Sequence, residues 1–214
     1  MTTDSVKKKE ESCHCDWIRK DVVLPDGFQY FYYQCPKCSR TEYTLQQVQR
    51  LMDYSEDNLF MFVSDWILAW LCVGDGAPIS GITKLQKQMF IILYEFAQEN
   101  NIPSENPGFR AYKYGPYTEA IDRNIAALVD IGMVESRGRI NTSHERFFLT
   151  DAGKAKGKEA LDKLTPEQIE KLKDLRRDLQ QFDTDGIMRY VYSHYPEFTD
   201  ESIVFERVLH RRRK

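Results

Sequence analysis

Residues 13–38 read CHCDWIRKDVVLPDGFQYFYYQCPKC and contain four of the five cysteines of the chain. These cysteines form two pairs that residues 16–34 separate. Structural zinc sites take four thiolate or imidazole ligands from two short loops, and two cysteine pairs at this distance are typical of a zinc ribbon. The predicted ligands of one structural Zn²⁺ are Cys13, Cys15, Cys35 and Cys38. The pattern leaves open whether His14 replaces a cysteine.

The connector between the cysteine pairs supports a small β-structure. Residues 18–24 and 28–34 are rich in β-branched and aromatic residues, and Pro25-Asp26-Gly27 between them is typical of a tight turn. A hairpin of these strands would bring the two cysteine pairs together. Its aromatic run, residues 30–33, is too large for two strands to bury. Some of these rings should pack on the next domain, whereas others could stack on a base or a partner.

Other uses of the cysteines fit less well. Two disulfides need an oxidising compartment, but residues 1–11 are polar and do not resemble a signal peptide. A redox pair at Cys35 and Cys38 would leave Cys13 and Cys15 unexplained. Cys72 lies in an apolar run and is expected to be a small buried side chain.

The composition favours a soluble globular protein. The 214 residues are 42% hydrophobic and 29% charged, with a formal net charge of −3, so no overall positive field indicates nucleic-acid binding. The longest apolar run, residues 59–73, is shorter than the roughly 20 residues of a membrane span. We therefore expect a cytoplasmic protein without membrane contact.

The periodicity after the ribbon predicts a mainly α (α+β) fold. Apolar spacing predicts helices near 44–53, 57–73, 83–100, 117–132, 150–164, 165–182, 185–194 and 199–209. Thr-x-x-Gln pairs predict capping boxes at Thr44/Gln47, Thr83/Gln86 and Thr165/Gln168. Residues 133–136 and 145–149 are expected strands around a polar tip. Three helices followed by such a hairpin is the order of a winged helix-turn-helix, with 117–132 as recognition helix and 137–143 as wing.

This order defines the expected domains. Residues 1–12 form a disordered tail and 13–43 the zinc ribbon. Residues 44–205 form the winged-helix domain with its helical extension, and 206–214 a basic tail.

A large part of the chain resembles a known family. The stretches ISGITKLQKQMFIILYEF (79–96), FRAYKYGPYTEAIDRNIAALVDIGMVE (109–135) and FFLTDAGK (147–154) are similar to YwgA-type winged-helix proteins of bacteria and archaea, as is IMRYVYSHYPEFTDESI (187–203). More distantly they resemble the Panacea domain of SocA-like antitoxins, which differ after the Gly-Pro pair. The resemblance covers most of residues 57–205 and implies a fold rather than a reaction. The zinc ribbon is an addition to that pattern.

The residues give little support for catalysis. The four histidines share no motif, and no acid, base and nucleophile set stands out, so we expect a protein that is not an enzyme. A DNA-binding function requires basic or amide side chains on the recognition helix and the wing. The candidate contacts are Thr118, Arg123, Arg137, Arg139 and Arg146. Lys84 and Lys87 at the start of the preceding helix would add positive charge. Against these, the 117–132 helix carries more acids than bases.

Two functions follow. The first is a non-catalytic, zinc-binding winged-helix transcription regulator that binds double-stranded DNA as a homodimer. The alternative is a module that binds a protein partner, such as an antitoxin-like neutraliser or an adaptor. The acidic 117–132 helix and the exposed aromatic residues favour this alternative.

Overall fold

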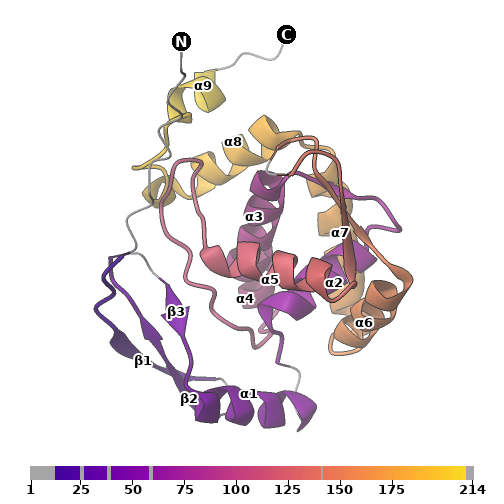
Figure 1. The fold of residues 1–214 in the computed structure, drawn as a ribbon. Coiled ribbons are helices and arrows are strands. Elements are labelled where there is room, and N and C mark those ends of the chain that lie inside the picture. The colour runs from indigo at the N-terminus through magenta and orange to yellow at the C-terminus, as the bar shows by residue number, and fades with distance from the viewer. Residues whose placement is uncertain (1–12, 25–26, 38–39, 58–59, 141, 211–214) are drawn as a thin grey trace, which may run out of the picture.

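The computed structural model describes residues 13–24, 27–37, 40–57, 60–140 and 142–210 (Figure 1). These residues form an α+β structure with two small antiparallel sheets, one in the order β1-β2-β3 and one in the order β4-β6-β5. The α+β class predicted from the sequence is confirmed. The tail predicted at 1–12 and the last four residues of the basic tail predicted at 206–214 lie outside the described residues. Residues 206–210 of the predicted basic tail are helical instead.

The first sheet contains the predicted hairpin. Strand β1 spans Ile18–Val23, β2 spans Gln29–Gln34, and the short β3 spans Thr41–Glu42. Because alternate residues of a strand point to opposite faces, Tyr30 and Tyr32 are buried on one face while Phe31 and Tyr33 stay partly exposed on the other. The aromatic run is therefore divided between a core and a surface. Pro25 and Asp26 of the expected turn are outside the described residues.

Helix α1, Leu45–Asp57, covers the part of β2 that the short strand β3 leaves unpaired. The side-chain oxygen of Gln47 accepts the Phe31 N–H at 3.0 Å, and Nε of Arg50 donates to the Gln29 carbonyl at 3.1 Å. These bonds satisfy backbone groups that an edge strand would otherwise expose. The expected capping box is half formed, since Thr44 accepts the Gln47 N–H at 3.2 Å but the Gln47 amide oxygen is used by β2.

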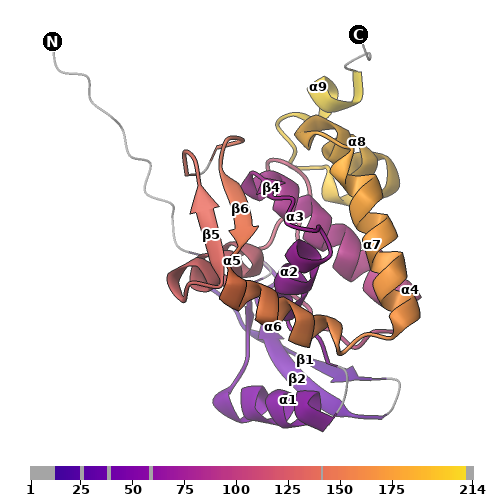
Figure 2. The same ribbon diagram turned by 90° about the vertical axis from the view of Figure 1, so that its right-hand side faces the viewer.

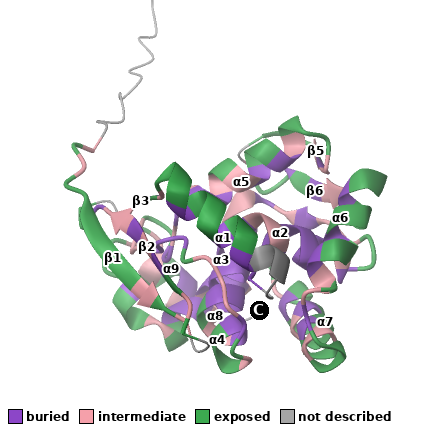
Figure 3. Ribbon diagram, turned by 90° about the horizontal axis from the view of Figure 1, so that it is seen from below, coloured by how far each residue is buried: buried purple, intermediate pink, exposed green. Residues whose placement is uncertain are grey.

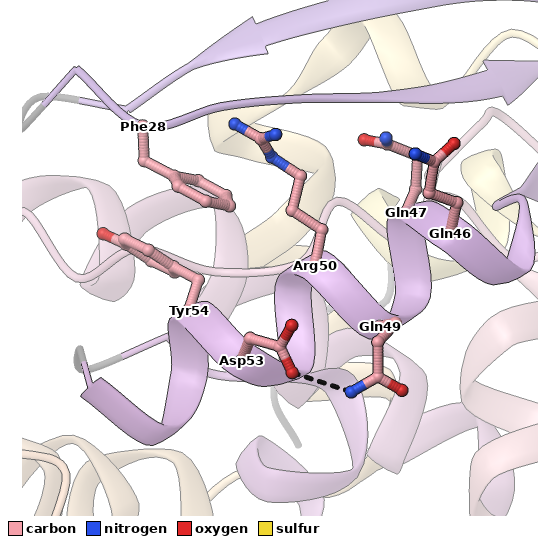
Figure 4. Close-up of a pocket in the computed structure, with 7 residues that line it drawn as sticks. All are labelled: Phe28, Gln46, Gln47, Gln49, Arg50, Asp53 and Tyr54. Atoms are coloured by element: carbon pink, nitrogen blue, oxygen red, sulfur yellow. Dashed lines mark hydrogen bonds between the residues drawn. The ribbon is translucent and has the colours of Figure 1, made fainter.

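The ribbon and α1 share a small aromatic core of their own. It consists of Tyr30, Tyr32, Leu51, Tyr54 and Phe60. Phe28 stacks on Tyr54 with ring centroids 3.9 Å apart, and the Arg50 guanidinium lies over Phe28 (Figure 4). The surface hollow beside them is lined mainly by side chains of α1, among them three glutamines. Burial of these rings gives the sheet a support that does not depend on the cysteines.

The larger core surrounds α2, Val63–Cys72, which is buried along almost its whole length (Figure 3). Its two tryptophans find hydrogen-bond acceptors inside the protein, as buried indoles usually do. Trp66 donates to the Ser104 hydroxyl and Trp70 to the Gln88 amide oxygen, both at 3.0 Å. No helix among the described residues has the length and hydropathy that crossing a membrane requires.

The next helix is continuous but irregular. It runs as α3, Ile82–Ile91, then a π-helical segment, Ile92–Phe96, and then α4, Ala97–Glu99. The predicted capping box of Thr83 and Gln86 is wrong: Gly81, at φ +81°, is the N-cap, and no side chain caps the helix. The N-cap lies two residues earlier than expected, so the Gln86 amide does not cap the helix and makes another contact.

Helix α5, Glu119–Asp130, leads into the second sheet (Figure 2). Strands β5, Val134–Arg137, and β6, Arg146–Leu149, form a hairpin, and β4, Ile79–Ser80, pairs with the other edge of β6. The register opposes Ser136 to Phe147 and Arg137 to Arg146. We call the face with Ser136 and Phe147 the inner face and the face with the two arginines the outer face.

The remaining helices close the core. They are α6, Asp151–Leu161; α7, Pro166–Gln180; α8, Thr184–His194; a 3₁₀ turn, Pro196–Phe198; and α9, Phe205–His210. The predicted Thr165/Gln168 capping box is formed in both directions. The apolar stripe of α7 faces the core, with Leu172 and Leu179 buried. The last helix is shorter than expected, because α9 begins only at Phe205.

Candidate metal centre and nucleic-acid interface

Three of the four predicted ligands lie together at one end of the first sheet. The sulfur atoms of Cys13, Cys15 and Cys35 are all within 4.8 Å of one another, and Sγ of Cys13 is 3.9 Å from Sγ of Cys35. Two thiolates on a tetrahedral zinc, with Zn–S bonds of about 2.3 Å, are separated by about 3.8 Å. The observed spacing suits thiolates that share an ion, so this cluster could hold a metal.

The strand register explains why these cysteines meet. Ile18 at the start of β1 lies opposite Gln34 at the end of β2, so the residues before β1 and after β2 come to the same end of the hairpin. Cys35 is fully buried there, and its N–H donates to the Arg40 carbonyl at 3.0 Å, which turns the chain back toward β3. The two loops are also joined by an ion pair between Lys37 and Asp16, which raises the pKa of Lys37.

Three further residues have a side chain that could bind a metal: Cys38, His14 and Cys72. Cys38 lies outside the described residues, so its place as fourth ligand stays a prediction. His14 is exposed and does not belong to the group of clustered ligand atoms found among the described residues. Cys72, at the end of α2, is half-buried and far from this group in the chain, and burial raises the pKa of its thiol.

The proposed base contact Thr118 is occupied elsewhere. It is only 4% exposed, its hydroxyl accepts the Ala120 N–H at 3.1 Å as the N-cap of α5, and it donates to the Pro107 carbonyl at 2.6 Å. A side chain held this way cannot reach a base edge. Arg123, one turn further along α5, is exposed.

The first sheet lies against the amino end of α5. Arg40, just before β3, donates through Nε to the Glu119 carboxylate at 3.1 Å, and its second nitrogen lies 2.9 Å from the same oxygen. Nearby, the Asn106 amide donates to the Tyr32 hydroxyl at 3.1 Å. The sequence carries no signal for these contacts, since 79 and 74 residues separate the partners. The end of α5 that a recognition helix usually presents to bases is thus covered.

The three hairpin arginines are all exposed. Arg137 and Arg146 are cross-strand neighbours on the outer face, and Arg139 lies in the loop beyond them. Arg137 makes two 2.7 Å hydrogen bonds to Glu135 and lies over the Phe148 ring at 4.8 Å. This bidentate contact lowers the pKa of Glu135 and raises that of Arg137. Both side chains are exposed to solvent, so the pair is weak and open to competition.

The expected positive charge at the start of α3 is not on the surface. Lys87 is 1% exposed and donates to the Pro116 carbonyl at 2.6 Å; burial lowers the pKa of its ammonium group to about 7. Lys84 is half-buried and donates to the Phe182 carbonyl. Burial, which sequence spacing does not report, removes both from the set of DNA contacts.

Gln86 and Lys87 together hold the turn that precedes α5. The Gln86 amide donates to the Thr118 carbonyl and to Asp122, each at 2.8 Å, and accepts the Thr118 N–H at 3.3 Å. With the bond from Lys87 to Pro116, this joins the Lys-Leu-Gln-Lys and Tyr-Gly-Pro-Tyr stretches on which the family resemblance partly depends. These residues hold the turn before α5 in place.

Comparisons with known proteins do not identify the chain. No family model, no curated protein and no solved structure matches it. The resemblance to YwgA-type proteins therefore stays a prediction.

Proposed function

We propose that the chain is a non-catalytic regulatory protein with a winged-helix fold that binds double-stranded DNA through its hairpin. The observation that carries the proposal is the pairing of Arg137 with Arg146 on the outer face of β5 and β6, with Arg139 at the tip. Guanidinium groups in this arrangement suit phosphate oxygens or a narrow minor groove.

The connectivity supports a winged helix. The elements follow in the order α2, β4, α3, α5, β5 and β6, and β4 pairs with β6. A short strand between the first two helices that joins the wing is characteristic of winged helices. In this proposal α5 takes the place of the recognition helix and the hairpin that of the wing.

In this proposal the hairpin makes most of the contacts with DNA, and α5 makes few. Thr118 is buried and Glu119 is bonded to the ribbon, so the amino end of α5 offers no base-reading side chain. Arg123 is the exposed basic residue of α5, and the acid Asp130 near the other end of the helix would repel phosphate. Such an interface favours contacts that position the protein on DNA over contacts that specify sequence.

The proposal assigns one Zn²⁺ to the cysteine cluster, with Cys38 completing a tetrahedral set. Four thiolates with no open position are typical of a structural site. The ion would fix the loops at the end of the β1–β2 hairpin, and hence the position of Arg40 against α5. Its role is structural, and no reaction is assigned to it.

The DNA-binding proposal is tested by removing charge from the hairpin. A variant with Arg137→Gln, Arg139→Gln and Arg146→Gln should bind a 20-base-pair duplex at least tenfold more weakly at low salt, measured by fluorescence anisotropy. The slope of log affinity against log salt should become shallower by about 2 to 3, because each lost phosphate contact removes roughly 0.9 from it.

The matched control removes the same charge elsewhere. Lys171, Lys173 and Arg177 are exposed on α7, and their replacement by Gln should change affinity less than twofold. An equal loss in both variants would mean that only net charge matters. No binding of the unaltered protein at low salt would overturn the proposal.

The second candidate, a protein-binding module of the antitoxin-like or adaptor kind, is favoured by a different observation. The inner face of the same hairpin meets α5 in an apolar hollow rimmed by acids, which suits a polypeptide better than DNA. The expected homodimer also stays a prediction; the exposed apolar residues Leu45, Val48 and Met52 on one side of α1 would be the first face to test for it.

A further inference from the structure

A groove runs between α5 and the inner face of the hairpin. It encloses about 290 Å³, and its apolar lining consists of Ile82, Ile125, Ala126, Val129, Ile140 and Phe147. Phe147 and Ile125 form a buried floor, with 3% and 4% of their surface exposed. Ile140, near the tip of the hairpin, is 71% exposed at its edge. This exposed apolar side chain adjoins the apolar floor of the hollow.

The charged residues of the groove are all acidic. Asp122, Asp130 and Glu145 line it, and none of the described residues in its lining is a lysine or arginine. Asp122 accepts hydrogen bonds from the Gln86 amide and the Tyr117 hydroxyl, which are neutral donors. Asp130 is exposed at the far end of α5. Glu145 is buried and accepts a hydrogen bond from the Ser136 hydroxyl. The groove therefore combines an apolar floor with negative charge at Asp122 and Asp130.

The groove is separate from the basic surface of the hairpin. Ser136 and Phe147 face it, whereas their strand neighbours Arg137 and Arg146 point to the opposite side. Phosphate would be attracted to the outer face and repelled by the inner one. The two faces thus suit ligands of opposite charge.

We propose that this groove binds a polypeptide segment that presents one or two aliphatic side chains flanked by lysine or arginine. The volume lies at or below the lower limit for drug-sized ligands, which suits the side chains of a partner rather than a small molecule. An amphipathic helix laid along α5 would place its apolar residues on Ile125 and Val129 and its cations near Asp122 and Asp130. This inference does not rest on DNA binding; it gives the alternative function a surface and a partner chemistry.

The test uses the full chain and two labelled synthetic peptides. One is a 14-residue helix-forming sequence of leucines at i, i+3, i+4 and i+7 with lysines elsewhere, and the other has glutamates in place of the lysines. In anisotropy titrations the lysine peptide should bind at least tenfold more tightly than the glutamate peptide. Methyl NMR shifts should occur at Ile125, Val129 and Ile140.

Two variants locate the binding. Ala126 is exposed on the groove side of α5, so Ala126→Trp should fill the groove without disturbing the core and weaken the lysine peptide at least tenfold. Asp130→Lys should weaken it severalfold through charge alone. The Arg137→Gln, Arg146→Gln double variant should bind the peptide as the unaltered protein does, whatever its effect on DNA.

Three outcomes would overturn the inference. Equal binding of the two peptides would show that charge complementarity plays no part. Undiminished binding to Ala126→Trp would place the peptide elsewhere. If neither peptide binds and Ala126→Trp instead converts a dimer to a monomer in sedimentation, the groove is occupied by a second copy of the chain and not by a basic segment.

Discussion

The Lys87 ammonium group sits inside the protein with a single carbonyl acceptor. Its pKa falls from an ordinary value of 10.5 to about 7, because burial disfavours the charged form, while the nearby charge of Asp122 acts in the opposite direction. Between these two values the folded protein holds fewer protons on Lys87 than the unfolded chain does. Stability must therefore rise with pH across this window.

We predict a difference in pH dependence between the unaltered protein and Lys87→Met. From pH 7.5 to 9.5 the free energy of unfolding of the unaltered protein should rise relative to that of the variant by about 1.4 kcal/mol per pH unit. Urea unfolding at several pH values measures this difference, in which the other titrating groups cancel. Parallel pH profiles for the two proteins would mean that Lys87 is solvated in the native state.

Two features of Gly115, which precedes the Pro116 carbonyl that Lys87 binds, disfavour any larger residue: a positive φ and a close neighbouring ring. Its φ is +83°, and a Cβ there would lie 2.5 Å from the Tyr192 ring. Gly76 has the same φ, but a Cβ on it would meet nothing within 4 Å. We predict that Gly76→Ala costs about 1 to 2 kcal/mol of unfolding free energy, from the backbone alone.

Gly115→Ala should cost about 1 to 3 kcal/mol more than Gly76→Ala, since overpacking adds to the same backbone strain. Thermal or urea unfolding of both variants measures the difference. Equal costs would show that Tyr192 can move aside.

At the scale of elements, the ribbon has two sources of stability. The aromatic core shared with α1 holds one end of the sheet, and the cysteine cluster holds the other. Metal binding in small zinc domains supplies on the order of 10 kcal/mol. The ion is thus expected to order the cysteine loops, whereas the aromatic core keeps β2 and α1 together without it.

We predict that Cys35→Ser with Cys38→Ser releases about one zinc per chain, measured by elemental analysis of the purified protein. Proton exchange should accelerate in the amides of β1 and β3, and not in those of α2 and α3. The helical core should remain folded, because it is built around α2 and does not include the ribbon.

Cys72→Ser is the matched control and should retain the metal, since Cys72 is outside the cluster. Metal retained in the Cys35/Cys38 variant would mean that the ligand set is wrong. Metal-free unaltered protein would remove the zinc site from the proposal.

At the scale of the whole molecule, local patterns predicted most helices and both hairpins, because apolar spacing and turn residues act within one element. Strands β3 and β4 were not predicted, because they are two residues long and too short to show a period. The Thr83/Gln86 capping box is wrong because the N-cap of the helix is Gly81, and the Gln86 amide instead bonds Thr118, 32 residues away. Partners this distant leave no trace in a local pattern.

In the candidate sites too, features set within one element were predicted, whereas those set by contacts between distant elements were not. The spacing of the cysteines and the turn between the two strands were enough to predict that Cys13, Cys15 and Cys35 lie together. The exposed positions of Arg137, Arg139 and Arg146 were expected from a polar loop. The burial of Thr118 and Lys87 depends on how helices pack, and the Arg40–Glu119 contact depends on how the ribbon lies on the core. The acidic groove needs both the helix and the hairpin in place.

The pairing of β4 with β6 bears on how the chain is made. Ser80 pairs with Arg146, so 66 residues must be synthesised after β4 before its neighbour exists. At roughly 5 to 20 residues per second on the ribosome, this delay lasts about 3 to 13 s. During that interval β4 has been synthesised but cannot yet pair with β6. An excised β5–β6 hairpin would lack β4, and an isolated two-stranded hairpin is only marginally stable in water, so the arginine-bearing hairpin should be studied in the intact polypeptide.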